Sequence, residues 1–550
     1  MSALSRVCWP FVRLVWMLLN EVGGNLSHAR RAAAHPRKVT MKTSRIACPL
    51  ATLGVALILP LTACSAGDEL GAPPEAGALA ATSESLADQC TSSLLAPDLG
   101  ATQTTLAIVA QADAEVRGTD PNTNFGSATS ISVKGTGSSE SFAKFRFEVR
   151  DFVTITSATL TFTVTDPLPN NFGGVMKGHD SWEERPKVVS GATLWPGITY
   201  ANAQGAYGQF ISYFPGGTGA QTVNVSSWVN RNGVFTFDII SSSASDTLTM
   251  NSREAASGKP TLTIVGRKNP TPSACRAWAN PTQIGNLLPD RSENQWSGLA
   301  ASRLIPGRFY THGDKKPIMT SGWPTFFAVS GTGVDQNAYL MADYVTGQPL
   351  TIDTKADFEE IQTGPGPFPD AASWVYLGDI GDNGRSRTNI NIYRAVEPYP
   401  QETFAYLEQL KVAYPGGMML NAEAFIIDPV TGSLFIIEKP CGGTAGGTVA
   451  GKNRIFQLGA PLPFGDGAVH TLWDTGKAID MTNESGTVDT DSGCGPNATR
   501  GVTRQQRRAT GSSASVNGDE LAVTFYSRNK SWYRAANTDV ATALAATGAT

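Results

Sequence analysis

Seven short segments between residues 129 and 266 alternate apolar and polar side chains with a period of two, and turn-forming residues separate them. They lie at 129–133, 142–149, 158–165, 221–229, 234–241, 247–252 and 261–266. This period is that of a β-strand with one face toward a core, and many such runs in series are typical of a sandwich or jelly roll. We therefore predict an all-β fold with a jelly-roll β-sandwich over residues 101–267, in which the strand 142–149 has one buried and one wet face.

The length and charge of the chain bound the rest of the prediction. A chain of 550 residues is too long for one core, so two or three domains joined by linkers are expected. Charged residues make up 16 % of the chain and the net charge is −4. This balance disfavours nucleic acid and anionic membrane surfaces as electrostatic partners.

Residues 41–63 have the pattern of a lipoprotein signal peptide. Lys42 and Arg45 precede an apolar run that is short for a membrane span and ends in Leu-Thr-Ala before Cys64. We predict that cleavage leaves Cys64 as the first mature residue and that its thiol carries the lipid. The expected location is the outer membrane or cell surface through this anchor, and otherwise the extracellular medium.

The segments on either side of the signal peptide are not expected to fold. Residues 1–40 would delay the signal peptide, so they are predicted to be a misassigned start or a non-native extension. Residues 64–100 are small and polar, and cannot bury enough apolar surface to fold. They are predicted to form a disordered tether.

The sandwich segment also resembles a known family. The runs ADAEVRGTDPNTNFGSATSISVKG, SFAKFRFEV, SATLTFTV, DSWEERP, LWPGI and MNSREAASGKPTLTIVG follow one another in order over about 155 residues. They resemble the DNRLRE-type carbohydrate-binding module of secreted bacterial proteins. The resemblance implies a β-sandwich and, as reported for some members, binding of an acidic polysaccharide such as alginate.

A site for such a polyanion needs cations on an exposed face, and aromatic rings can stack on sugars. By strand phase or motif position, the candidate residues are Lys134, Lys144, Arg146 and Arg253, together with Trp182 and Trp195. The alternative for the cations is ordinary solvent-facing strand charge. The alternative for Trp182 is a core position, because it lies in the DSWEERP motif.

Four later segments resemble copies of one unit. They begin near residues 296, 358, 422 and 511, and each runs through an apolar strand, a Gly or Pro turn and a second strand. Repetition of small β-units indicates a propeller. The runs SGLAASR, DFEEI, YLGDIGDN and NAEA also resemble motifs of a secreted bacterial β-propeller family, distantly similar to phytase-type and esterase-type propellers. We predict a β-propeller-like domain over residues 277–550, incomplete because a closing unit is expected beyond Thr550.

Six carboxylates of this domain fall at strand ends of neighbouring units, where a propeller can bring them to one mouth of its channel. They are Asp357, Glu359, Glu360, Asp379, Asp382 and Glu423. Hard oxygen ligands suit Ca²⁺, and paired carboxylates suit acid–base catalysis. The alternative is turn chemistry, in which Asp and Asn bond their own backbone.

Other catalytic signals are weak. The histidines are scattered without zinc spacing, and no nucleophile elbow or phosphate-binding loop stands in the right context. His312 is predicted to be structural, and no catalytic residue is assigned.

Four cysteines of the predicted mature chain can form disulfides in an oxidising compartment, and they permit three pairings. Cys90 and Cys275 bracket the sandwich, and Cys441 and Cys494 bracket a Gly-rich insertion. This bracketing favours a Cys90–Cys275 and a Cys441–Cys494 bond. Free thiols and the other pairings are the alternatives.

The sequence thus predicts an exported cell-surface lipoprotein that binds polysaccharide or cell-wall glycan through its sandwich and presents a propeller interaction surface. Binding is favoured over catalysis. The alternatives are a calcium-dependent phosphoesterase or esterase-type hydrolase in the propeller, and a purely structural surface protein.

Overall fold

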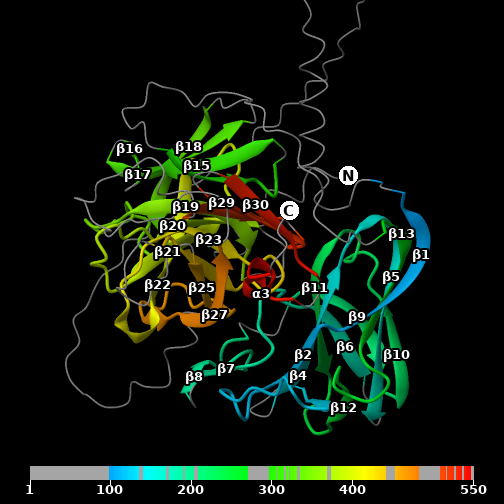
Figure 1. Ribbon diagram of the computed structural model, residues 1–550. Coiled ribbons are helices and arrows are strands. Elements are labelled where there is room, and N and C mark those ends of the chain that lie inside the picture. The colour runs from blue at the N-terminus through cyan, green and yellow to red at the C-terminus, as the bar shows by residue number, and fades with distance from the viewer. Residues whose placement is uncertain are drawn as a thin grey trace, which may run out of the picture. The chain divides into compact units, whose positions relative to one another are not determined.

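A computed structural model describes residues 98–546 of the chain, apart from short gaps and three longer stretches at 271–295, 441–451 and 482–507. In this described part, strands alternate with loops, and the helical elements are the short η2 (Pro415–Gly417) and α3 (Val540–Leu544) (Figure 1). The prediction of an all-β fold is confirmed. The predicted lipidation residue and disulfide residues lie outside the described residues; they are Cys64, Cys90, Cys275, Cys441 and Cys494.

The sandwich domain consists of strands β1 to β13, arranged in two antiparallel sheets (Figure 1). One sheet has the order β1-β13-β5-β12-β3, with β10 also paired to β5, and the other has the order β2-β4-β11-β6-β9. A short ribbon of β7 and β8 stands apart. The bounds are β1 (Thr102–Val109), β2 (Ala112–Arg117), β3 (Ser130–Val133), β4 (Ser141–Val149), β5 (Phe152–Asp166), β6 (Phe172–Lys177), β7 (Lys187–Val189), β8 (Ala192–Trp195), β9 (Phe210–Pro215), β10 (Gly219–Asn224), β11 (Gly233–Ser241), β12 (Leu248–Asn251) and β13 (Thr261–Lys268).

The core of this domain lies between the two sheets and follows from the alternation of the strands. Leu160 and Phe162 of β5 are fully buried, as are Phe145 and Phe237 on β4 and β11 of the facing sheet. The ring of Phe162 meets that of Phe214 edge to face, with centroids 4.9 Å apart. Each predicted run from 129 to 266 contributes to a strand, although the run 221–229 ends earlier, at Asn224.

The expectation of a wet face on strand β4 is wrong, because all nine residues of β4 are buried. The outer face of this strand is covered by Trp182 and Ile198, which form a second small core with Phe142 and with Ala112 and Ala114 of β2. A loop segment therefore takes the place of solvent on the outer side of the sheet.

The second domain, which we call the propeller-like domain, is a series of four antiparallel meanders. They are β14-β15-β17-β18, β19-β20-β21-β22, β23-β24-β25-β27 and β28-β29-β30. The first two join into one ten-stranded sheet because β18 pairs with β22 in parallel, and β16 and β26 pair with β17 and β22. Their bounds are β14 (Trp296–Ala301), β15 (Arg308–Gly313), β16 (Ile318–Thr320), β17 (Trp323–Ser330), β18 (Asp335–Asp343), β19 (Phe358–Pro365), β20 (Ser373–Asp379), β21 (Ile390–Val396), β22 (Phe404–Ala413), β23 (Ala422–Ile427), β24 (Leu434–Glu438), β25 (Lys452–Leu458), β26 (Val469–Thr471), β27 (Trp473–Asp480), β28 (Ala509–Ala514), β29 (Glu520–Phe525) and β30 (Arg528–Tyr533). The four predicted units coincide with these four meanders.

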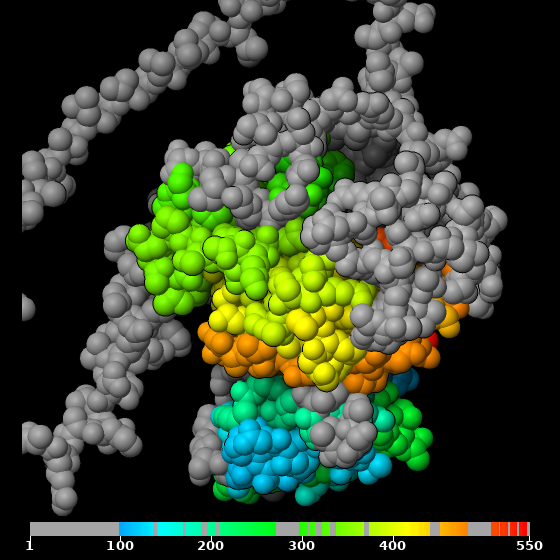
Figure 2. Space-filling model, turned by 60° about the vertical axis from the view of Figure 1, so that its left-hand side comes forward, coloured from blue at the N-terminus to red at the C-terminus, as the bar shows by residue number. Residues whose placement is uncertain are grey.

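The first strands of the meanders are joined to one another by side-chain hydrogen bonds. Ser297 Oγ of β14 donates to the Glu359 carbonyl of β19 over 2.8 Å. Ser512 Oγ of β28 donates to the Phe425 carbonyl of β23 over 2.7 Å, and the Ser512 amide donates to the Glu360 carboxylate over 2.6 Å. In Figure 2 the green, yellow and orange surfaces of successive meanders adjoin. This arrangement is propeller-like and brings the starts of different units together.

Candidate functional site

Lys144, a predicted glycan contact, lies in the interior of the sandwich domain. Its side chain is 1 % exposed, and Nζ lies 2.8 Å from Oδ1 of Asp238 on β11, which is also buried. Burial raises the pKa of the Asp238 carboxyl, and the charge of Lys144 acts in the opposite direction. The expectation that Lys144 faces solvent is therefore wrong, because it forms one half of a buried ion pair.

Arg146 and Trp182 pack against each other on the same covered face. The guanidinium carbon of Arg146 lies 4.9 Å from the centroid of the Trp182 ring, and Arg146 also donates to the Trp182 carbonyl. Trp182 is 1 % exposed, and its indole N–H donates to Thr236 Oγ1 over 3.1 Å. Burial lowers the pKa of Arg146. The expected exposure of Arg146 is wrong, and the core alternative agrees with the position of Trp182.

Arg253 belongs to an ion-pair hub that joins three segments of the predicted family motifs. Its Nε donates to Glu184 Oε1 over 2.6 Å, and its backbone amide donates to Asp113 Oδ2 over 2.5 Å. Glu184 Oε1 also accepts from the Asp113 amide over 2.8 Å. Burial, together with neighbouring Glu254 and Glu184, raises the pKa of Asp113 to about 8. The Arg253 guanidinium thus already has an internal carboxylate partner.

The remaining two predicted glycan contacts lie at the edges of the sandwich domain. Lys134 is half-buried and forms an isolated β-bridge with Ser141. Trp195 ends β8, where its backbone pairs with Lys187 of β7; its side chain lies outside the described part of the structure. The six predicted residues are therefore not gathered into one exposed surface.

In the propeller-like domain, three carboxylates converge on one place, which we call the acidic cluster: Asp314, Asp357 and Glu359. One oxygen of each lies within 4.8 Å of the others. Two oxygens bound to the same Ca²⁺ stand at most about 5 Å apart, because Ca–O distances are about 2.3–2.6 Å. A side chain at Gly381 would collide with the Asp357 carboxylate, so this glycine makes room for it. The donor set and its spacing fit a hard divalent cation.

Glu423 and Lys439 lie next to the acidic cluster. Lys439 forms an ion pair with Glu423, and Glu423 in turn acts electrostatically on Glu359. Burial and the neighbouring Glu423, Asp357 and Asp314 raise the pKa of Glu359 to about 10. The neighbouring carboxylates therefore disfavour the charged form of Glu359, and a bound proton or cation would relieve this repulsion.

The other predicted carboxylates have structural partners. Asp379 pairs with Arg387 over 2.7 Å. Asp382 accepts from the Arg387 amide over 2.8 Å, which is the turn chemistry considered from the sequence. Glu360 is fully buried and accepts from the Ser512 amide. These three therefore build turns and join units, and only Asp357, Glu359 and Glu423 of the six meet at the cluster.

Two members of this region were missed by the sequence analysis. Asp314 follows β15 in the THGD segment, and Lys439 follows β24. Their positions directly after a strand were the signal that could have found them, because the other cluster residues also stand at strand ends. His312, two residues before Asp314, is fully buried and its Nδ1 lies 2.8 Å from the Gly313 carbonyl oxygen, in agreement with a structural role.

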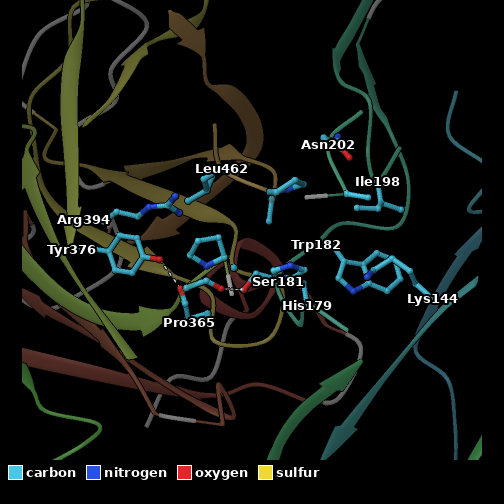
Figure 3. A pocket seen from close by; sticks show the side chains of 16 residues that line it. Lys144, His179, Ser181, Trp182, Ile198, Asn202, Pro365, Tyr376, Arg394 and Leu462 are labelled. Atoms are coloured by element: carbon cyan, nitrogen blue, oxygen red, sulfur yellow. Dashed lines mark hydrogen bonds between the residues drawn. The ribbon is translucent and has the colours of Figure 1, made fainter. Parts of the chain in front are cut away.

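A pocket opens between the segment around Ser181 and the strands β19 to β21 (Figure 3). It encloses about 450 Å³, including solvent at its mouth. The Tyr376 hydroxyl donates to the Pro365 carbonyl over 2.5 Å, and Ser181 Oγ donates to the Gly366 carbonyl over 3.3 Å. The first bond lies within the propeller-like domain, and the second joins it to the segment around Ser181. The described residues of the pocket present no constellation of acid, base and nucleophile.

Fold and site define an all-β protein of two domains, one a sandwich with internally paired charges and the other a propeller-like domain with an acidic cluster. Residues 104–266 match the model of carbohydrate-binding module family 96. This range coincides with the strands of the sandwich domain, so the match supports a carbohydrate-binding module there. No curated protein matches the chain, and no helix of the described residues is long and apolar enough to cross a membrane.

Solved structures with partial similarity include three sugar-active enzymes. An aldose sugar dehydrogenase from Streptomyces coelicolor, in its PQQ-bound form, is 14 % identical with a TM-score of 0.24, covering 49 % of this chain and 83 % of that one. The Hadza microbial sialidase Hz136 is 9 % identical with a TM-score of 0.21, covering 70 % and 73 %. A β-glucuronidase from Ruminococcus gnavus is 8 % identical with a TM-score of 0.15, covering 64 % and 53 %.

Proposed function

We propose that this protein is an exported surface protein that binds polysaccharide through its sandwich domain. The observation that carries the proposal is the match of residues 104–266 to a carbohydrate-binding module family, on a domain whose strands run from Thr102 to Lys268. The signal-peptide pattern before Cys64 supports export and a lipid anchor at the outer membrane or cell surface. The propeller-like domain is then the part that the anchor and the sandwich hold near the glycan.

The test is a polysaccharide array probed with the purified full chain, with and without Ca²⁺. The array holds neutral polymers and uronic-acid polymers side by side, and a chain unfolded in urea serves as the matched control for non-specific retention. Retention of the folded chain on a subset of polymers is the expected result. Equal retention of the folded and unfolded chains, or none on any polymer, would refute the proposal.

A second function is favoured by the acidic cluster, which we propose as a Ca²⁺ site. Asp314, Asp357 and Glu359 would supply the oxygen ligands, and the neighbouring Glu423 would add negative charge. The cation would neutralise these carboxylates. It would thereby hold the start of β19 close to Asp314, which directly follows β15. A calcium-dependent phosphoesterase would use the same site, with the cation polarising a phosphoryl oxygen.

Thermal unfolding in CaCl2 and in EDTA tests the site. Ca²⁺ at 100 times its Kd should stabilise the folded chain by about 2.7 kcal/mol. Glu359→Gln should remove this gain, whereas Asp166→Asn, which changes an exposed carboxylate at the end of β5, should keep it. Release of p-nitrophenol from p-nitrophenyl phosphate, abolished by EDTA, would add the enzymatic function. An unchanged melting temperature across all Ca²⁺ concentrations would rule the site out.

A further inference from the structure

Three aromatic rings form an exposed group at the edge of the sandwich domain, and neither the family motifs nor the predicted site includes them. Phe172 of β6 is 47 % exposed, and Phe210 and Tyr213 of β9 are 42 % and 62 % exposed. The Tyr213 ring lies between the other two, with its centroid 4.6 Å from that of Phe172 and 4.5 Å from that of Phe210. We call this group the aromatic platform.

The sheet itself holds the platform in place. β9 is the edge strand of its sheet and pairs with β6, and Gly174 of β6 stands opposite Tyr213. A Cβ atom on Gly174 would lie 3.4 Å from the Phe210 ring and 3.0 Å from Ile240, so the ring of Phe210 packs closely over this glycine. The glycine therefore leaves room for the Phe210 ring, and Tyr213 packs against both neighbouring rings; such packing before a ligand arrives reduces the entropy cost of binding.

The two strands that carry the platform, β6 and β9, expose no cation among their described residues. By sequence, β6 and β9 contain a single ionisable residue with a formal charge, Lys177. Its side chain is buried, and Nζ lies 2.6 Å from Asp180 Oδ1. Two of the cations that the sequence predicted as contacts for a polyanion, Lys144 and Arg253, form ion pairs with internal carboxylates.

We infer that the aromatic platform is the glycan-binding surface of the sandwich domain and that its ligand is a neutral polysaccharide, whose pyranose C–H face stacks on Tyr213. This inference rests on the proposed glycan-binding function and names the class of glycan. A flat apolar sugar face suits an exposed ring, and a uronic-acid polymer would find no exposed cation on the two strands that carry these rings.

The experiment measures the affinity of the full chain for neutral and uronic-acid polysaccharides in 0.1 M and 1 M NaCl. The chain should retain neutral polymers equally at both salt concentrations, because stacking is not screened. Tyr213→Ala should lower this affinity about tenfold, equivalent to about 1.4 kcal/mol, and Phe210→Ala should lower it as well. Tyr213→Phe should keep it, because the ring remains.

Tyr344→Ala is the matched control, since Tyr344 is 51 % exposed in the propeller-like domain, and it should leave binding unchanged. Hydrogen exchange of β6 should be the same in all variants, which separates lost binding from lost folding. Binding of wild type with no loss in Tyr213→Ala and Phe210→Ala would overturn the platform. Binding that is confined to uronic-acid polymers and lost in 1 M NaCl would overturn the neutral ligand. A wild-type chain that binds no polysaccharide would instead refute the proposed function itself.

Discussion

Replacing Lys144 by Met tests directly whether the charges on β4 belong to the fold or to a ligand. Lys144 is 1 % exposed and its Nζ lies 2.8 and 3.1 Å from the two oxygens of Asp238, which is fully buried. Removal of one partner of a buried ion pair leaves an uncompensated charge and costs about 3–5 kcal/mol. We expect Lys144→Met to lower the free energy of unfolding of the sandwich domain by this amount.

The loss should depend on pH in a defined direction. Burial raises the pKa of Asp238 in the folded chain, and removal of Lys144 removes the charge that opposes this shift. In the variant the folded state holds a proton that the unfolded state releases above about pH 4, so stability falls as pH rises. Lys144→Met should therefore be less destabilised at pH 5 than at pH 8. Lys144→Met with Asp238→Leu should regain most of the loss, because an apolar pair of similar volume carries no desolvation penalty.

Native-state hydrogen exchange of peptides from β4 and β11 measures this free energy within the sandwich domain. Arg267→Met is the control, because Arg267 and its partner Asp98 are 44 % and 45 % exposed; such a surface pair contributes at most about 1 kcal/mol. Unchanged protection in Lys144→Met together with lost glycan retention would refute the reasoning, since Lys144 would then act on a ligand.

Three further predictions concern other parts of the fold. Burial raises the pKa of Asp113 to about 8, so the folded chain keeps a proton that the unfolded chain loses near pH 4. The free energy of unfolding should therefore fall by up to about 1.4 kcal/mol per pH unit between these two values. Asp113→Asn should flatten this slope in urea titrations at several pH values. Gly173→Ala would place a Cβ inside the contact distance of the Phe214 ring and should cost about 1–3 kcal/mol in a melting experiment, whereas Gly217→Ala, with nothing within 4 Å of the new atom, should melt like wild type. Ser512→Ala removes the hydrogen bond to the Phe425 carbonyl and should cost about 1 kcal/mol, read as faster exchange in β23; unchanged exchange would mean that the first strands of the units are not coupled through this bond.

The strands that the sequence predicted are those in which one face is apolar and the other polar. The runs at 158–165 and 261–266 became the neighbouring strands β5 and β13 because their apolar residues, such as Leu160 and Ile264, are buried in the sandwich core. The four similar segments that begin near residues 296, 358, 422 and 511 also predicted the four meanders, because each segment begins a new apolar strand after a turn. Local patterns of this kind carry the information for secondary structure and for the order of units.

Two of the strands that the predicted runs did not include, β6 and β9, carry the aromatic platform. β6 reads FGGVMK, and its two glycines break the alternation. β9 reads FISYFP, with large apolar residues in both phases and a proline at its end. Such a pattern does not say which face is buried, because Phe214 packs in the core while Tyr213 is 62 % exposed. Only the tertiary pairing of β6 with β9 decides which rings face outward.

The charged candidates failed for a related reason. Strand phase placed Lys144 and Arg146 correctly on the outer face of β4, but it could not show that Trp182 covers that face. The acidic cluster was partly predictable because its members stand at strand ends. The division between cluster and turn depends on partners that strand phase does not reveal. Arg387 reaches back to Asp379 from the loop before β21, and Lys439 comes from a later unit than Glu359.

The motif residues of the sandwich domain have a role that bears on glycan choice. Asp113, Glu184 and Arg253 come from three separate motif segments and meet in one ion-pair hub, and Trp182 closes the neighbouring core. These contacts stabilise the fold and engage the side chains of Asp113, Glu184, Arg253 and Trp182 internally. The exposed rings, Tyr213 above all, lie outside the motif segments. If the aromatic platform binds the glycan, substitutions on the edge strand β9 should change the ligand while Asp113, Glu184 and Arg253 keep the fold.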